Sequence, residues 1–249
     1  MVSDGNRLAF QLDPSDLSGA RRCYERAAEA GDTDAMVSLG KLLAHLVDPP
    51  DLDGAQQWYG TGARAGDTDA MVNLAELLAD RLDPPDVDSA QYWSEKAARA
   101  GDPRAWYRLG VIFARRGDRE GVEKAWRRVI DTVDADPQTV ASAAFGLAAL
   151  AALDGYPDMA WPLLQVARAC GSLLAAHCAA SLAENPASRQ AALVQLAHHA
   201  QEPAALNFLG LATSRDGARS DTIAYWQRSA RSGDPVAPLL LHLAGGAAC

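Results

Sequence analysis

The heptapeptide AGDTDAM occupies residues 30–36, and the same seven residues recur at 65–71. A close variant, AGDPRAW, stands another 35 positions on, at residues 100–106. The preceding segments align at the same offset, as LDPSDLSGARRCYERAAEAGD (12–32), VDPPDLDGAQQWYGTGARAGD (47–67) and LDPPDVDSAQYWSEKAARAGD (82–102). Self-similarity at such a period is typical of a solenoid, in which each repeat is one supersecondary unit.

Each repeat carries two apolar patterns at helical spacing. The first pattern, helix A, contains Met36, Leu39, Leu42 and Leu43, and the second, helix B, contains Ala20, Cys23, Tyr24 and Ala27. The sequence therefore predicts one helical hairpin per repeat.

The AGD stretch predicts the junction from helix B to the next helix A. Glycine accepts the left-handed conformation that ends a helix, which assigns this position to Gly31, Gly66 and Gly101. The aspartate after each glycine is expected to cap the following helix, because its carboxylate accepts hydrogen bonds from free N–H groups. The DPPD segments at 48–51 and 83–86 predict the other junction, since proline cannot continue helix A.

Small residues recur in both helices and predict close approach of two helix backbones. On helix A they are Gly40, Ala75, Gly110, Gly146, Ala180 and Gly210, and on helix B they are Ala20, Ala55 and Ala90. Trp58 and Trp93, also one repeat apart, are interpreted as core wedges between successive hairpins.

The pattern predicts an all-α solenoid of about six helical hairpins plus a C-terminal helix. Residues 1–134 contain the well-matched repeats, of which the first is truncated, and residues 135–249 contain degenerate repeats that continue the same solenoid. The last helix contains PLLLHL (238–243), which is apolar on nearly all sides, so the two ends are expected to be uncapped and to permit a homo-oligomer.

Composition limits the possible partners. The formal net charge of -9 argues against nucleic acid and anionic membranes. No secretion signal and no membrane-spanning stretch is found, so a cytoplasmic protein is expected, and the four cysteines are expected to be thiols. The one basic cluster, interpreted as solvated helix faces, contains Arg115, Arg116, Arg119, Lys124, Arg127 and Arg128.

AMVSLG (35–40) with DLDGAQQWYGTGARAGD (51–67), and AWYRLG (105–110), resemble Sel1-like repeats, relatives of the tetratricopeptide repeat. The resemblance implies a right-handed superhelix that acts as a non-enzymatic adaptor for another protein. Cys170 and Cys178 are similar to a pair that a cysteine-rich subgroup bridges. With one such pair and no export signal, reduced core thiols are favoured here.

The same resemblance implies which helix A positions line a concave, partner-binding wall. These are Val37, Lys41, His45, Val72, Glu76, Asp80, Tyr107, Val111, Arg115, Ala143, Leu147, Leu150, His177, Asn207 and Leu211. The wall would be charged at one end and apolar at the other, which suits a partner helix or extended peptide. In an alternative interpretation Leu147, Leu150 and Leu211 are core residues, because the register slips in the degenerate repeats.

There are two alternatives to the adaptor function. One is a small-molecule hydrolase of the cysteine-rich Sel1-like type, and the other is a self-assembling repeat protein. The chain contains no Gly-x-Ser-x-Gly, no phosphate-binding glycine loop and no His-Glu-x-x-His. A metal set can be imagined from His177, Cys178, His198, His199 and His242, but adjacent histidines on a helix point about 100 degrees apart. No metal, cofactor or catalytic residue is therefore expected.

Overall fold

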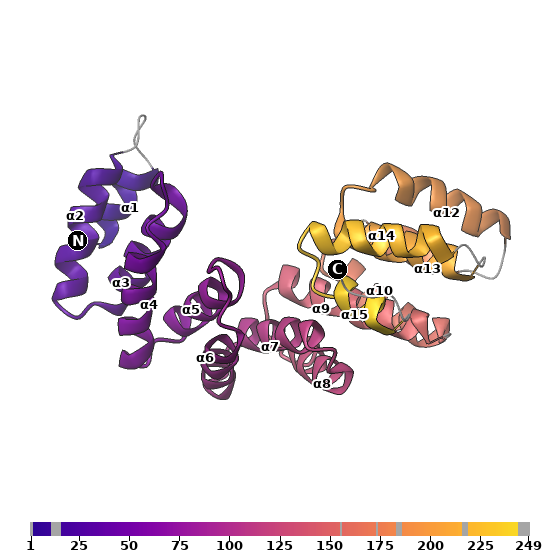
Figure 1. Ribbon diagram of the computed structural model, residues 1–249, viewed down its shortest axis with the longest axis horizontal. Coiled ribbons are helices and arrows are strands. Elements are labelled where there is room, and N and C mark those ends of the chain that lie inside the picture. Colours follow the sequence, from indigo (N-terminus) through magenta and orange to yellow (C-terminus); the bar gives the residue numbers. More distant parts are fainter. Residues whose placement is uncertain are drawn as a thin grey trace. The chain divides into compact units, whose positions relative to one another are not determined.

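A computed structural model describes residues 2–10, 16–154, 156–172, 174–182, 186–215 and 219–243. All regular elements of these residues are helices (Figure 1). The chain divides into two compact units, Met1–Arg108 (unit 1) and Leu109–Cys249 (unit 2). None of the described helices has the length and apolar character needed to cross a membrane.

Unit 1 contains alternating helices A and B. They are α1 (Val2–Phe10), α2 (Leu17–Glu29), α3 (Thr33–Lys41) with a short π-helical extension η1 (Leu42–Leu46), α4 (Leu52–Ala65), α5 (Thr68–Asp80), α6 (Val87–Arg99) and the first half of α7 (Pro103–Arg115). The truncated repeat at the N-terminus thus still forms a helix, α1, which packs against α2.

Unit 2 continues the alternation with the second half of α7. Its further helices are α8 (Arg119–Ile130), α9 (Pro137–Leu153), α10 (Pro157–Ala169), α11 (Leu174–Ser181), α12 (Pro186–His198), α13 (Pro203–Arg215), α14 (Arg219–Arg231) and α15 (Ala237–Leu243). Over the described ranges the helices pair as A and B up to α14, and α15 follows as the C-terminal helix. The predicted all-α repeat fold is confirmed.

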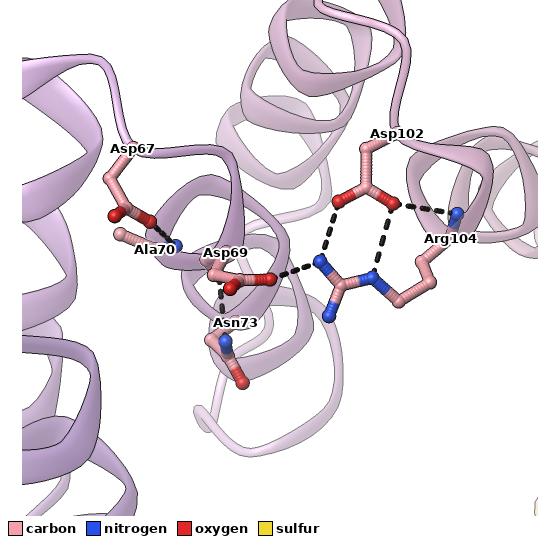
Figure 2. Close-up of polar contacts among 6 residues, drawn as sticks. All are labelled: Asp67, Asp69, Ala70, Asn73, Asp102 and Arg104. Atoms are coloured by element: carbon pink, nitrogen blue, oxygen red, sulfur yellow. Dashed lines mark hydrogen bonds and ion pairs between the residues drawn. The ribbon is translucent and has the colours of Figure 1, made fainter. Parts of the chain in front are cut away.

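The junctions between helices have the predicted chemistry. Gly31, Gly66 and Gly101 have φ values of 93°, 99° and 96°, which lie in the left-handed region. The Asp67 carboxylate accepts a hydrogen bond of 2.7 Å from the Ala70 N–H at the start of α5 (Figure 2). Asp51 caps α4 in the same way, through the Gly54 N–H at 2.8 Å.

A glycine on helix A faces an aromatic ring on the following helix B. A Cβ placed on Gly40 would lie 2.4 Å from Cε1 of Tyr59, closer than atoms can approach, so only glycine fits beside this buried ring. The same relation recurs along the chain. The other pairs are Gly5 with Tyr24, Gly110 with Trp126 and Gly210 with Trp226, with corresponding distances of 2.4, 2.1 and 2.3 Å.

One repeat replaces both members of this pair together. At the positions of Gly40 and Tyr59, one repeat later, the chain has Ala75 and Ser94, and both are buried. The larger residue on helix A is therefore matched by a smaller one on helix B, so the alanine methyl group has no ring to overlap. We call this contact between helix A and helix B the wedge.

Trp58 and Trp93, interpreted from the sequence as core wedges between successive hairpins, are not core residues. Both side chains are half-buried, whereas Tyr59, the neighbour of Trp58, is fully buried. Successive residues on a helix point about 100 degrees apart, so an error of one position moves a side chain off the packed face. The glycines also admit a ring, where close approach of two backbones was expected.

In unit 2 the helices A also pack on one another. The Phe145 ring on α9 meets the Phe208 ring on α13 edge to face, with centroids 6.5 Å apart. The sequence predicted that the C-terminal helix leaves its apolar residues exposed. This prediction is wrong for Leu239, Leu240 and Leu241 of α15, which are buried. The C-terminal residues 244–249, which include Cys249, lie outside the described residues.

Gly40→Ala is expected to lower the free energy of unfolding by about 1–3 kcal/mol, because its methyl group overpacks the site against Tyr59. In a Tyr59→Ser background, which copies the Ala75–Ser94 pair, the same change is expected to cost much less. Urea titrations of the four proteins measure this difference.

Gly60→Ala on α4 is the matched control, since its Cβ would meet only the end of the flexible Arg64 side chain, at 3.3 Å. It is expected to be neutral or stabilising, because alanine favours the helix. If Gly40→Ala lowers the free energy of unfolding equally in the parent and in the Tyr59→Ser background, the wedge is contradicted.

Candidate partner-binding surfaces

The predicted wall residues of unit 1 separate into exposed and buried sets. Lys41, His45, Glu76 and Asp80 are exposed and Tyr107 is half-buried, but Val37 and Val72 are buried. The outward positions of helix A are four, three and four residues apart. Val37 and Val72 do not fall on this spacing, so their side chains lie on the face that packs against the core. The outward positions are Asp34, Ser38, Lys41 and His45 on α3 and η1, Asp69, Asn73, Glu76 and Asp80 on α5, and Arg104 and Arg108 on α7. We call this set the unit 1 stripe.

Ion pairs join α5 to α7 across the unit 1 stripe. The Arg104 guanidinium donates to both carboxylate oxygens of Asp102, at 3.1 and 2.6 Å, and also to Asp69 (Figure 2). The Asp102 side chain is buried, and its hydrogen bonds raise the pKa of Arg104, which stays charged. Asp69 is held in turn on α5, where Asn73 Nδ2 donates to its backbone carbonyl.

A second arginine repeats this connection one helical turn further along. Arg108 donates to Glu76 Oε2 at 2.9 Å and to an Asp80 carboxylate oxygen. The Arg108 side chain is mostly buried, so its partners are held in one arrangement. Two arginines of α7 thereby offset part of the negative charge of α5.

A small polar recess lies at the edge of the unit 1 stripe. It has a volume of about 10 Å³, room for a single water-sized group. The buried Tyr59 hydroxyl reaches its wall and has no hydrogen-bond partner among the described residues, and burial raises its pKa. In the preceding repeat the Tyr24 hydroxyl donates to Asn6 Oδ1 at 2.6 Å.

In unit 2 most of the predicted wall residues are buried. The buried residues are Val111, Ala143, Leu147, Leu150, Asn207 and Leu211, while His177 is half-buried and Arg115 is exposed. The expectation of an open apolar wall is corrected for these six, because the helices A of unit 2 pack on one another. Their burial agrees with the alternative interpretation of Leu147, Leu150 and Leu211 as core residues.

Asn207 has a structural role in unit 2. Its side-chain Nδ2 donates to Asp234 at 2.9 Å, and its backbone carbonyl accepts from Trp226 Nε1 at 3.1 Å. Asp234 in turn caps α15 through the Val236 and Ala237 N–H groups. Burial raises the pKa of Asp234, and these hydrogen bonds oppose that shift.

Unit 2 contains a pocket of about 380 Å³ between α8, α9 and α10, which we call the α8–α10 pocket. It is lined by Arg119, Glu123, Arg127, Leu147, Leu150, Ala151, Asp154, Tyr156, Asp158, Met159, Pro162 and Leu163. Leu147 and Leu150 are 4% and 1% exposed and form its floor. Two predicted residues thus lie beneath this pocket, on the side of α9 that faces α8 and α10, although they expose almost no surface.

Arg119 closes one end of this pocket. Its guanidinium donates to Asp154 Oδ1 at 2.7 Å and to Glu123 Oε1 at 3.0 Å. The hydrogen bond with Asp154 is the main cause that raises the pKa of Arg119. Lys124 pairs with Glu120 in the same helix, so these members of the basic cluster lie on mixed-charge faces, as interpreted from the sequence.

The cysteines and histidines do not form a metal-binding group within the described part of the chain. His177 and His199 stack with ring centroids 6.0 Å apart, and His199 Nδ1 lies 2.8 Å from Glu202 Oε1. Cys170 and Cys178 are both free thiols. Burial raises the pKa of Cys178, so its thiol stays protonated and is a poor nucleophile.

Sequence reasoning missed Asp69, Arg104 and Arg108 as members of the stripe. A signal was present in the repeated heptapeptide itself. The second aspartate of AGDTDAM becomes arginine in AGDPRAW, so Asp69 and Arg104 occupy the same position in successive repeats. Equivalent positions of neighbouring helices A lie side by side in a stacked array, so a reversal of charge between them predicts an ion pair.

Comparison with solved structures identifies the class of fold. The chain matches the crystal structure of c5321, a protective antigen of uropathogenic Escherichia coli strains that displays an SLR fold, with a TM-score of 0.64 and 18% identity. The match covers 100% of this chain and 56% of that one, so the protein spans little more than half of its length.

Two further structures agree. A Sel1 repeat protein from Oxalobacter formigenes matches with a TM-score of 0.60 and 21% identity over 97% of this chain and 75% of that one. A tetratricopeptide repeat protein from Parabacteroides merdae matches with a TM-score of 0.55 and 13% identity over 98% of this chain and 99% of that one. No protein-family model and no curated protein matches the sequence. The protein has the fold of the Sel1-like and tetratricopeptide repeat solenoids.

Arg108→Met is expected to lower the free energy of unfolding by about 1 kcal/mol at low salt, because both ion pairs are lost and the charge is mostly shielded from water. The difference from the parent is expected to shrink as salt is raised. Arg99→Met, which breaks an exposed pair with Glu95 on α6, is the control and is expected to have little effect. Equal effects of the two changes would contradict a connecting role for Arg108.

Proposed function

We propose that the protein is a non-enzymatic scaffold that binds another protein along the unit 1 stripe. The observation that carries this proposal is the set of polar side chains at equivalent positions of α3, α5 and α7, exposed on α3 and α5 and joined by ion pairs between α5 and α7. Side chains fixed before binding lose little conformational entropy when a partner docks.

Lys41, His45 and Asp34 extend the stripe beyond the ion-paired helices. These side chains are exposed, and they place both signs of charge on the surface of α3 and η1. A partner segment with the complementary charge order is favoured, and the charges would fix its direction along the stripe. Glu76 and Asp80, both bound to Arg108, are available to the same partner from α5.

The chemistry of unit 2 supports a binding role over a hydrolase. The α8–α10 pocket is lined by apolar, acidic, tyrosine and arginine side chains, without a serine, cysteine or histidine next to its floor. Cys178, which a cysteine-dependent reaction would need as a thiolate, is buried with a raised pKa. Both features agree better with recognition than with covalent catalysis.

Affinity capture of the full chain from its native cell, with cross-linking and mass spectrometry, tests the proposal. Lys41→Glu and Glu76→Lys reverse one charge each on α3 and α5, and both are expected to lower recovery of the specific partner by about tenfold, the effect of losing one well-placed charged contact. Arg64→Glu, on the exposed surface of α4, is the control for the change in net charge of Lys41→Glu, and Glu95→Lys on α6 is the control for that of Glu76→Lys.

Equal recovery with the parent, both stripe variants and both controls would contradict binding at the stripe. Circular dichroism of each variant separates loss of binding from loss of fold. Leu147 and Leu150 also belong to the wall predicted from the sequence, but acidic substitutions there cannot test binding. Both side chains are buried, so the change would place an unpaired charge in the core of unit 2.

A further inference from the structure

The α8–α10 pocket has the properties of an anchor site for a second, different contact. Its volume of about 380 Å³ falls in the range of ligand-binding pockets. A cavity of about 150 Å³ lined by Leu, Ile and Phe binds one benzene molecule, so this pocket has room for two bulky apolar side chains. Its accessible apolar lining comes from Leu163 and Met159, next to the buried Leu147 and Leu150.

The rim of the pocket presents two exposed apolar side chains beside its charged residues. Tyr156 is 59% exposed and Met159 is 54% exposed. Tyrosine, tryptophan, methionine and arginine are the residues enriched at the centres of protein interfaces. Covering this rim would remove substantial apolar surface from water.

The shape of the pocket follows α8. Arg119, Glu123 and Arg127 are four residues apart and line one side, which gives the pocket a length of roughly 12 Å at 1.5 Å of rise per residue. On the floor, Leu147, Leu150 and Ala151 lie on one face of α9. This length corresponds to about two turns of a partner helix, whose side chains at i and i+3 or i+4 share one face.

Charge fixes the remaining chemistry. Arg119 is bound to Asp154 and Glu123, but Arg127 on α8 and Asp158 on α10 have no ion-pair partner among the described residues. Among the described residues the pocket therefore offers one unpaired cation from α8 and one unpaired anion from α10. An occupant gains most if it presents a carboxylate to Arg127 and a basic group to Asp158.

We infer that the α8–α10 pocket binds an amphipathic helical segment of a partner protein, which inserts two bulky apolar side chains flanked by an acidic and a basic residue. This contact is separate from the unit 1 stripe and does not depend on it. The segment belongs to a different protein, since a second copy would bring another net charge of -9 to the contact.

Selection from a library of random 16-residue peptides, displayed on phage and captured by the immobilised full chain, tests the inference. Enriched peptides are expected to carry two bulky apolar residues three or four positions apart, together with an acidic and a basic residue. The best peptide is then synthesised with a fluorescent label, and its affinity is measured by anisotropy against the parent and the variants.

Met159→Glu and Arg127→Glu are expected to lower the affinity for the peptide by about tenfold or more, the usual effect of losing a central contact. Tyr156→Ala is also expected to weaken it, whereas Tyr92→Ala, which removes a tyrosine of nearly equal exposure (58%) from α6 in unit 1, is expected to leave the affinity unchanged. Glu76→Lys on the unit 1 stripe is expected to have no effect, so failure here and failure of the proposed function are distinguishable.

Three results would overturn the inference. One is that no peptide is enriched over an unrelated protein. Another is that the enriched peptides bind Met159→Glu and Arg127→Glu as tightly as the parent. The third is that light scattering shows a dimer of the parent that Met159→Glu dissociates, because the occupant would then be a second copy of the chain.

Discussion

A glycine on helix A that admits an aromatic ring from helix B holds four of these hairpins together. Gly40 leaves a space that the Tyr59 ring fills, Gly5 does the same for Tyr24, and Gly110 and Gly210 do the same for Trp126 and Trp226. Because a Cβ on any of these glycines would overlap the ring, each contact restricts the distance and the rotation between its two helices. Repetition of this contact sets the positions of the outward-facing side chains, including the charged residues of the unit 1 stripe.

The features that the sequence predicted are local ones. Gly66 ends a helix and Asp67 begins the next because the backbone groups at a helix end need those two residues within a few positions. Trp58 was interpreted as the core residue where the buried ring is that of Tyr59, because the repeat period fixes which residues are equivalent and leaves their direction on the helix open. Packing between distant helices was also not predicted. The burial of Leu211, for example, depends on contacts within unit 2 that no periodicity specifies.

The two candidate surfaces differ in how far the sequence could have found them. The ion pair between Asp69 and Arg104 joins equivalent positions of successive repeats, so the exchange of acid for base was visible in the repeated heptapeptide. The α8–α10 pocket had no such signal, because three helices with drifting repeat spacing supply its lining. The proposed partner-binding role of both surfaces is argued from their surface side chains, while the repeat fold depends on buried contacts such as the wedge.

Hydrogen–deuterium exchange on Gly210→Ala tests the wedge most directly, because it reports helix by helix. A Cβ at this position would lie 2.3 Å from Trp226 Nε1, so α13 and α14 can no longer hold their native distance. The account predicts faster exchange in α13 and α14, with the helices of unit 1 unchanged. Protection of α13 and α14 equal to that of the parent protein would contradict it.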